Sequence, residues 1–398
     1  MRWARFYTQM RMIFIYFLIW RKIYANQNHS CLRYDAKHSR ENPQPTRKVF
    51  MRFSLPSLVL ASTLAAVSAS TLAAGSINIY SARHYKSDEA MYAAFTKETG
   101  IAINRVDSDD VGILNRLKSE GANSPADVVL MVDGTRLWKA DQDGVLAAIQ
   151  SPVLDKAIPE KYRAAKTPQG TTWFGFSNRA RVIVYDKGRV KKADVENYEQ
   201  LADPINKGKV CTRSGSHPYN LSLFGALMAH WGEAKTQDWM KGVVANFARS
   251  PKGADTDQIK AVASGECAIA LTNSYYLARL IKSSNGEDKN IAERVGVVFP
   301  DQASYGTHMN IAGGAVAKHS KNKADAQRFL EYLASPTAQE YFANGNNEWP
   351  IVPGMKLANP ALKAMTRGQN FKTDDTSIST IAANQAKVQQ LLDKAGFQ

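Results

Sequence analysis

The chain has 398 residues, of which 44% are hydrophobic and 22% charged, and its formal net charge is +15. This length exceeds what one hydrophobic core usually serves, so we expect two domains of a soluble globular protein. The charge is uneven, because residues 1–74 hold 11 Lys or Arg and only 2 Asp or Glu. The remaining 40 basic and 34 acidic residues include no basic run with interleaved aromatic residues, which excludes nucleic acid as the expected partner.

Residues 51–74 have the parts of a secretory signal peptide. Met51 and Arg52 open a short basic region, residues 55–67 are apolar, and small residues lead to a cleavage site before Gly75. The apolar stretch is too short to span a bilayer, so we expect it to be removed during export.

Residues 1–50 contain a second apolar run at 13–20, which is also too short for a membrane span. We interpret residues 1–50 as a misannotated or dispensable extension, with translation starting at Met51. The alternative is an additional anchor at a membrane surface. Mass spectrometry of the native N-terminus distinguishes the two.

Export changes the expectation for the cysteines. Cys31 lies in the discarded leader, and Cys211 and Cys267 remain. Two cysteines in an oxidising compartment most simply form one disulfide, and the alternative is a pair of buried free thiols. The signal peptide favours the disulfide.

The mature chain begins with strands that alternate with helices. Ser87 is expected to cap the first helix, and Gly100 is expected to end it. Alternation of this kind predicts an open α/β sheet with right-handed crossovers. The expected strands are at 77–80, 101–106 and 126–131.

A second α/β unit follows. Its expected strands are at 181–185, 209–212 and 267–271, with a mostly helical stretch at 221–245 and helices at 325–333, 337–342 and 382–392 near the end. Extended segments near 174–182 and 296–312 are predicted to cross between the two units. Such a chain could close around a ligand by hinge motion. We assign residues 75–178 and 300–350 to an N-lobe, and residues 179–299 and 351–398 to a C-lobe.

Three tyrosines follow the two cysteines at matching intervals. Tyr275 lies eight residues after Cys267 and is followed by Tyr276, and Tyr219 lies eight residues after Cys211. If the cysteines pair, equal offsets along two neighbouring strands bring three phenols to one place.

The loop after the first strand adds two more candidate donors, His84 and Tyr85. Ligands of open parallel sheets bind outside the carboxyl ends of the strands, so four phenols and one imidazole can converge there. Phenolate is a hard anionic donor that suits Fe³⁺, and imidazole is acceptable to iron. Calcium would require an Asp- or Glu-rich loop, and zinc or copper would not require four tyrosines.

Each of these residues also has a simpler interpretation. Adjacent tyrosines are more often packing residues than ligands, and a lone histidine is more often hydrogen-bonded within the fold. We interpret His217 as a bystander or an outer partner of the site, and His308 as structural. Strand-end placement, equal offsets and export together favour a metal site.

Several segments resemble the periplasmic ferric-iron-binding proteins of bacterial ABC transporters, in their tyrosine-rich, transferrin-like branch. The resemblance covers about residues 76–398, and its main segments are 79–85, 178–185, 209–219 and 273–276. It implies a two-lobed α/β protein with a class II periplasmic-binding-protein fold and crossing hinge strands. It also implies a periplasmic protein that carries Fe³⁺ as its transported ligand to an inner-membrane ABC transporter permease. We expect this protein to be a monomer.

The resemblance also assigns roles to individual residues. It implies that Tyr275 and Tyr276 bind the iron, that Tyr219 and Tyr85 are further phenolate ligands, and that His84 is a ligand used by some members. Arg179 corresponds to an arginine that can hydrogen-bond a ligand phenolate or hold a synergistic anion. Fe³⁺ with four phenolates is net −1, which Arg179 or Arg83 could offset. We therefore predict that no external anion is obligatory.

Two rival functions are distinguishable. The nearest is the same fold binding a small organic or oxyanion solute, such as a polyamine or sulfate, with tyrosines as walls or hydroxyl donors. An enzyme is not expected, because the sequence has no Gly-x-Ser-x-Gly, His-Glu-x-x-His, P-loop or Gly-x-Gly-x-x-Gly motif. Cys211 and Cys267 are also too far apart for a Cys-x-x-Cys redox motif.

Overall fold

The computed structural model describes residues 75–83 and 85–397. The segments 1–50 and 51–74, interpreted above as an extension and a signal peptide, lie outside the described residues. All of the described residues belong to one unit, Ala69–Gln398, and the following description concerns this second unit.

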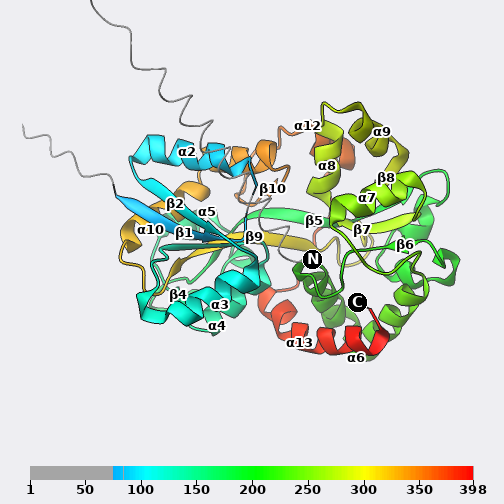
Figure 1. Cartoon of the computed structure of the whole chain (residues 1–398), viewed down its shortest axis with the longest axis horizontal. Coiled ribbons are helices and arrows are strands. Elements are labelled where there is room, and N and C mark those ends of the chain that lie inside the picture. Colours follow the sequence, from blue (N-terminus) through cyan, green and yellow to red (C-terminus); the bar gives the residue numbers. More distant parts are fainter. Residues whose placement is uncertain (1–74, 84, 398) are drawn as a thin grey trace, which may run out of the picture. The chain divides into compact units, whose positions relative to one another are not determined.

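The second unit is built from two α/β lobes, as the sequence predicts (Figure 1). In the first lobe, a central strand pairs in parallel with a strand on each side. The helices that connect these strands lie on opposite faces of the sheet (Figure 1). The elements are β1 (Ser76–Ser81) in the centre, β2 (Ala102–Asp107) and β3 (Val128–Met131) beside it, and the connecting helices α2 (Asp88–Thr99) and α3 (Asp110–Glu120).

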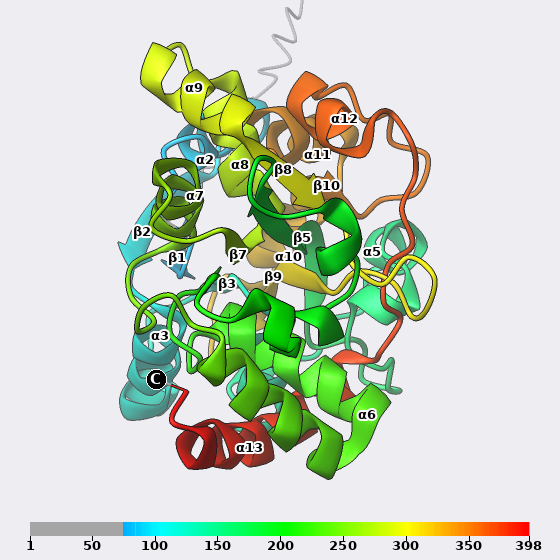
Figure 2. The ribbon, with the colours of Figure 1, turned by 90° about the vertical axis from the view of Figure 1, so that its right-hand side faces the viewer.

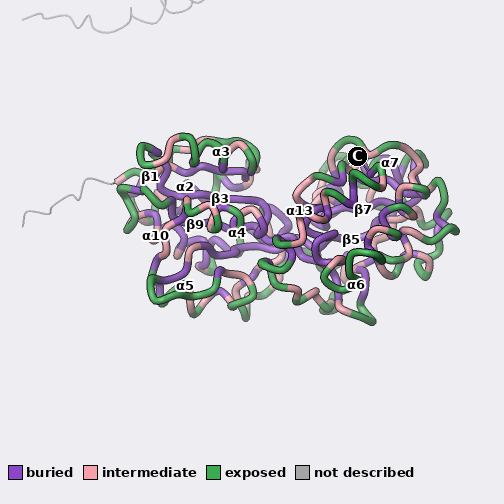
Figure 3. Tube along the Cα trace, turned by 90° about the horizontal axis from the view of Figure 1, so that it is seen from below, coloured by how far each residue is buried: buried purple, intermediate pink, exposed green. Residues whose placement is uncertain are grey.

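One long strand, β5 (Phe174–Asp186), belongs to the sheets of both lobes. Residues 174–180 of β5 pair with β9 (Met309–Ala317), which continues the first-lobe sheet. Residues 181–186 pair instead with the second-lobe strands β7 (Ile269–Asn273) and β8 (Val295–Val298). Both β5 and β9 are buried where they run between the lobes (Figure 3). The crossing predicted near 174–182 is thus a continuous strand.

The second lobe places helices around β7. The long helix α6 (Pro218–Ala245) packs along α13 (Ile378–Ala395), and the two lie side by side at the base of the lobe (Figure 2). Gly232 interrupts α6 with a φ of 77°, a backbone conformation that glycine adopts at little cost. The other elements of this lobe are β6 (Val210–Cys211), α7 (Asp255–Ser264), α8 (Ser274–Lys282), α9 (Gly286–Arg294) and α12 (Pro360–Thr366).

The apolar cores follow the two lobes, with one element shared between them. Ile378 and Ile381 of α13 pack in the core that contains Ile79 and Phe95 of the first lobe. Val388, ten residues beyond Ile378, packs in a core of the second lobe. The remaining elements of the first-lobe side are α4 (Gly134–Gln142), β4 (Leu146–Ala147), α5 (Pro152–Ala157), α10 (Lys323–Leu333), α11 (Pro336–Glu340) and β10 (Trp349–Pro350).

One predicted cap is wrong. Helix α2 begins at Asp88 and ends before Gly100, which is left-handed, but the side chain of Ser87 does not cap the helix. The Ser87 hydroxyl donates instead to the side-chain oxygen of Asn346. A partner 259 residues away therefore replaces the local hydrogen bond that the sequence favours.

Among the described residues, no helix combines the length and the apolar character needed to cross a membrane.

Candidate metal centre

Four phenols from three segments meet in this structure, and we call them the phenol cluster: Tyr85, Tyr219, Tyr275 and Tyr276. Tyr85 lies in the segment between β1 and α2 of the first lobe. Tyr219 is the second residue of α6, after Pro218, which suits the first position of a helix. Tyr275 and Tyr276 are the second and third residues of α8, which begins directly where β7 ends.

The phenols contact one another across the lobes. The hydroxyl oxygens of Tyr85 and Tyr275 lie 3.2 Å apart, and the ring centroids of Tyr275 and Tyr276 lie 4.0 Å apart. Tyr219 packs with Ala82 and Val132 of the first lobe, and Tyr276 packs against the same small cluster. The structure therefore brings together all four tyrosines that the sequence singles out.

A disulfide joins Cys211 and Cys267, with 6.0 Å between their Cα atoms. The predicted pairing is confirmed, but the argument from equal offsets is wrong. In the parallel pair β6–β7, Cys211 lies opposite Ala270, three residues beyond Cys267. Tyr219 stands in the first turn of α6 and Tyr275 in the first turn of α8, so their matching distances from the cysteines do not correspond to matching positions on the two strands.

Burial controls the protonation of the phenols. Tyr219 is 4% exposed and Tyr275 is 0% exposed. Burial raises the pKa of both hydroxyls well above 10, and neighbouring phenols raise it further, whereas the Arg179 guanidinium opposes the shift. Burial, followed by the carboxylate of Asp255, also raises the pKa of Tyr276. Without a metal, these three side chains are therefore neutral phenols at pH 7.

Four arginines lie near the phenol cluster, Arg83, Arg179, Arg213 and Arg279. The guanidinium carbons of Arg179 and Arg213 each lie 5.3 Å from the ring centroid of Tyr219. Arg279 lies over three rings, at 4.9 Å from Tyr85, 4.8 Å from Tyr275 and 5.7 Å from Tyr276. These cations would stabilise phenolates at the same positions.

Arg83 and Arg179 were predicted from the sequence, whereas Arg213 and Arg279 were not. Arg279 has a signal that could have identified it, because it follows Tyr276 by three residues and so lies on the same face of α8. Arg213 has no comparable local pattern, since it lies in the loop between β6 and α6.

The arginines differ in how far carboxylates already balance their charge. Arg83, whose guanidinium carbon lies 5.0 Å from the Tyr85 ring centroid, pairs with Asp88 at 3.1 Å and with Glu348 at 3.2 Å. Arg179 lies 3.7 Å from Glu348 and donates to the backbone oxygen of Val132. Among the described residues, Arg279 has no carboxylate within ion-pair distance. Arg279 therefore offers more uncompensated charge than the predicted Arg83.

The histidines have different positions. His84 lies outside the described residues. The Nδ1 atom of His217 accepts a hydrogen bond from the Tyr219 backbone N–H at 3.2 Å and so caps α6. Burial, reinforced by the charge of Arg213, lowers the pKa of His217 to about 2, which keeps this imidazole neutral. His308 is buried and hydrogen-bonds the hydroxyl of Ser222 at 3.0 Å.

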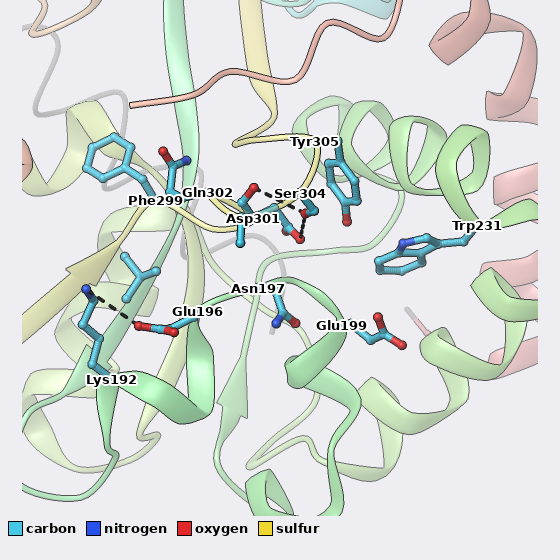
Figure 4. A pocket seen from close by; sticks show the side chains of 12 residues that line it. Lys192, Glu196, Asn197, Glu199, Trp231, Phe299, Asp301, Gln302, Ser304 and Tyr305 are labelled. Atoms are coloured by element: carbon cyan, nitrogen blue, oxygen red, sulfur yellow. Dashed lines mark hydrogen bonds and ion pairs between the residues drawn. The ribbon is translucent and has the colours of Figure 1, made fainter. Parts of the chain in front are cut away.

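Other parts of the described chain do not offer a comparable metal site. No group of three or more His, Cys, Asp or Glu side chains is placed to hold a metal ion within residues 75–83 and 85–397. A separate pocket of about 550 Å³ on the second lobe contains Glu196, Glu199 and Trp231, but none of the phenol cluster (Figure 4). In this pocket Glu196 lies 3.9 Å from Lys192.

Two lobes joined by hinge strands, with ligand-competent side chains converging between them, define a binding protein for a small solute. The family model for the bacterial extracellular solute-binding protein matches residues 90–372. The chain belongs to this family. Proteins of this family act outside the cytoplasm, which implies a periplasmic location for this chain. Its relatives are transport proteins rather than enzymes.

Comparison with individual relatives narrows the similarity to iron-binding proteins. The chain is 46% identical to iron uptake protein A1 of Synechocystis over 322 residues, which cover 81% of this chain and 87% of the relative. A solved Trichodesmium structure, described as a complex with iron and citrate ligands, is 47% identical, with a TM-score of 0.75 over 81% of this chain and all of that chain. The ferric binding protein of Campylobacter jejuni is 35% identical, with the same TM-score and coverage. The predicted periplasmic-binding-protein fold is confirmed.

Proposed function

We propose that this protein captures ferric iron between its two lobes through the phenolate oxygens of Tyr85, Tyr219, Tyr275 and Tyr276. The convergence of these four phenols carries the proposal, with Tyr85 and Tyr275 contacting each other from opposite lobes at 3.2 Å. The names of the relatives, which are iron uptake and ferric-binding proteins, support the same ligand.

The charges around the phenol cluster suit a trivalent ion. Four phenolates and Fe³⁺ carry a net charge of −1, and Arg179, Arg213 and Arg279 all lie within 6 Å of phenol rings. Cations at this range stabilise a buried anionic centre. For this reason we propose that iron binding does not require an external anion. The Trichodesmium structure, by contrast, is a complex with both iron and citrate.

The three second-lobe phenols would receive the ion first. Tyr219, Tyr275 and Tyr276 come from one lobe, so they form a partial site whether or not the first lobe is close. Tyr85 would complete the site when the lobes close around the metal. Iron would leave when the lobes separate again at an inner-membrane ABC permease, as expected for a protein of this family.

The same proposal includes the route of export. Residues 51–74 would direct the chain through the inner membrane as a cleavable signal peptide, and the mature protein would act as a periplasmic monomer. Size-exclusion chromatography with light scattering on the native protein tests the monomer, and its N-terminal mass tests the cleavage.

Titration of the mature protein with ferric citrate tests the proposed ligand. We expect one iron per chain and a visible absorption band from phenolate-to-iron charge transfer. Loading from ferric nitrilotriacetate, followed by removal of the free anion, should leave the same band. Iron bound without the band would exclude phenolate ligands. No iron bound, with heat released by spermidine or sulfate in calorimetry, would favour the organic or oxyanion solute instead.

A further inference from the structure

We propose that Asp255 and Arg181 are positioning residues for the iron site, because together they fix the two segments that carry Tyr219 and the pair Tyr275–Tyr276. This inference rests on the proposed function and names residues that do not themselves bind the metal.

Asp255 controls where α8 begins. Its side chain is fully buried at the first residue of α7. The Oδ2 atom accepts a hydrogen bond from the backbone N–H of Asn273 at 2.7 Å and one from Arg181 Nη1 at 2.6 Å. Asn273 is the last residue of β7, only two residues before Tyr275. The Asp255 carboxylate therefore holds the point at which the chain turns from strand to the helix with the tyrosine pair.

Arg181 connects this point to the segment of Tyr219. Arg181 is fully buried on β5, and its Nη2 donates to the side-chain oxygen of Asn220 at 2.5 Å. Asn220 follows Tyr219 directly, and its amide nitrogen donates to the backbone oxygens of Arg213 at 3.2 Å and Ser214 at 3.0 Å. The loop before α6 is thus tied to the guanidinium that also contacts Asp255.

The chemistry of the pair suits a positioning role. A buried ion pair is not an efficient source of stability, because desolvation offsets much of its attraction. The planar guanidinium does, however, direct its donors at fixed angles, so it holds two partners in one geometry. Metal sites depend on such support, since ligands must be held within a few tenths of an ångström.

Besides burial, the carboxylate of Asp255 also raises the pKa of Tyr276, so the alternative to a positioning role is a purely electrostatic one. If Asp255 acted only through its charge, its neutralisation would favour the Tyr276 phenolate and tighten iron binding. A positioning role predicts weaker binding and a changed spectrum, because the phenolate oxygens would lose their alignment.

The variant Asp255→Asn in the full chain tests this, with Asp127→Asn as a matched control. Asp127 is also a buried aspartate that accepts from a backbone N–H, that of Asn78, but its contacts lie within the first lobe. We expect Asp255→Asn to bind one iron with a shifted or weakened charge-transfer band. Its iron should pass to a competing chelator at least about tenfold faster, the scale seen for outer partners of metal ligands. Asp127→Asn should keep the wild-type band and iron-release rate, even if its thermal unfolding midpoint falls as far as that of Asp255→Asn.

Three results would overturn the proposal. The first is a folded Asp255→Asn protein with the wild-type band and release rate, and the second is an Asp255→Asn protein that binds iron more tightly than the wild type. The third is an Asp127→Asn control whose charge-transfer band changes in the same way as that of Asp255→Asn. If Asp255→Asn does not fold, Asn220→Ser decides by the same criteria, because it removes the Arg181 contact and the amide bonds to the loop before α6 while leaving Asp255 and its bond to Asn273 in place. The wild-type chain is titrated in parallel. A wild-type protein without the band overturns the proposed function and this inference with it, whereas a normal wild type beside an unchanged variant overturns this inference alone.

Discussion

The hydroxyl oxygens of Tyr85 and Tyr275 lie 3.2 Å apart although 190 residues separate them in the chain. One belongs to the first lobe and the other to the second, so the contact exists only while the lobes are together. A metal bound at this point would therefore report directly on lobe closure.

Replacing Tyr85 should leave the initial binding of iron intact but speed its release. In Tyr85→Phe the three second-lobe phenols remain, so we expect iron to bind and the charge-transfer band to persist at altered intensity. Release to a chelator should accelerate by more than about tenfold, because the first lobe no longer contributes a phenolate. Stopped-flow absorbance measures this rate. Tyr92→Phe, which alters another buried phenol of the first lobe, is the control and should release iron at the wild-type rate.

Replacing Tyr276 should weaken the partial site itself. Tyr276→Phe removes a charged oxygen donor and keeps the ring that packs on Tyr275. We expect the affinity for ferric iron to fall by more than about 100-fold, beyond the range for outer partners of a metal ligand. Competition with a chelator of known affinity measures it, and Tyr185→Phe on β5 serves as a control in the same lobe. Unchanged affinity would exclude Tyr276 as a ligand.

Iron binding should weaken steeply as the pH falls. The pKa values of Tyr219, Tyr275 and Tyr276 are raised by burial in the metal-free protein, so each must lose a proton when it binds iron. Protons therefore compete with the metal, and the apparent affinity rises with pH as long as the metal-free phenols stay protonated. Chelator competition between pH 5.5 and 7.5 tests this direction. An affinity that is flat over this range would contradict phenolate ligation.

Removing the disulfide should lower the free energy of unfolding but leave iron binding largely intact. The bridge closes a loop between residues separated by 56 positions, for which chain entropy gives about 4 kcal/mol of stabilisation. We expect Cys211→Ala/Cys267→Ala to unfold at lower urea concentration while still showing the charge-transfer band, because the helix starts, and not the cysteines, set the tyrosine positions. An unchanged urea midpoint, or loss of the band in the folded variant, would contradict this.

The parts of the fold that depend on local pattern were predictable from the sequence. Alternating strands and helices, the end of α2 at Gly100 and the crossing strand near 174–182 all follow from short-range signals. The tyrosines were predictable because they follow strand ends, where ligands of α/β sheets bind.

The remaining features depend on partners distant in the chain. Ser87 does not cap α2 because Asn346 accepts its hydroxyl, and no local pattern announces that contact. Arg213 approaches Tyr219 only because the loop after β6 folds back toward α6. The equal spacing from the cysteines pointed to tyrosines that do converge, but it is not the reason for their convergence, since the strand register is offset by three residues.

Helix α13 has a consequence for how the chain acquires its structure. Ile378 and Ile381 belong to the core of the first lobe, so that lobe lacks part of its interior until nearly all 398 residues have been synthesised. The segment that contains Cys211 and Cys267 emerges well before then. The bridge needs an oxidising compartment, so in an exported chain it can form once both cysteines have reached that compartment, and it needs no residue of α13. The last helix of the polypeptide thus completes the core that packs against its first strands.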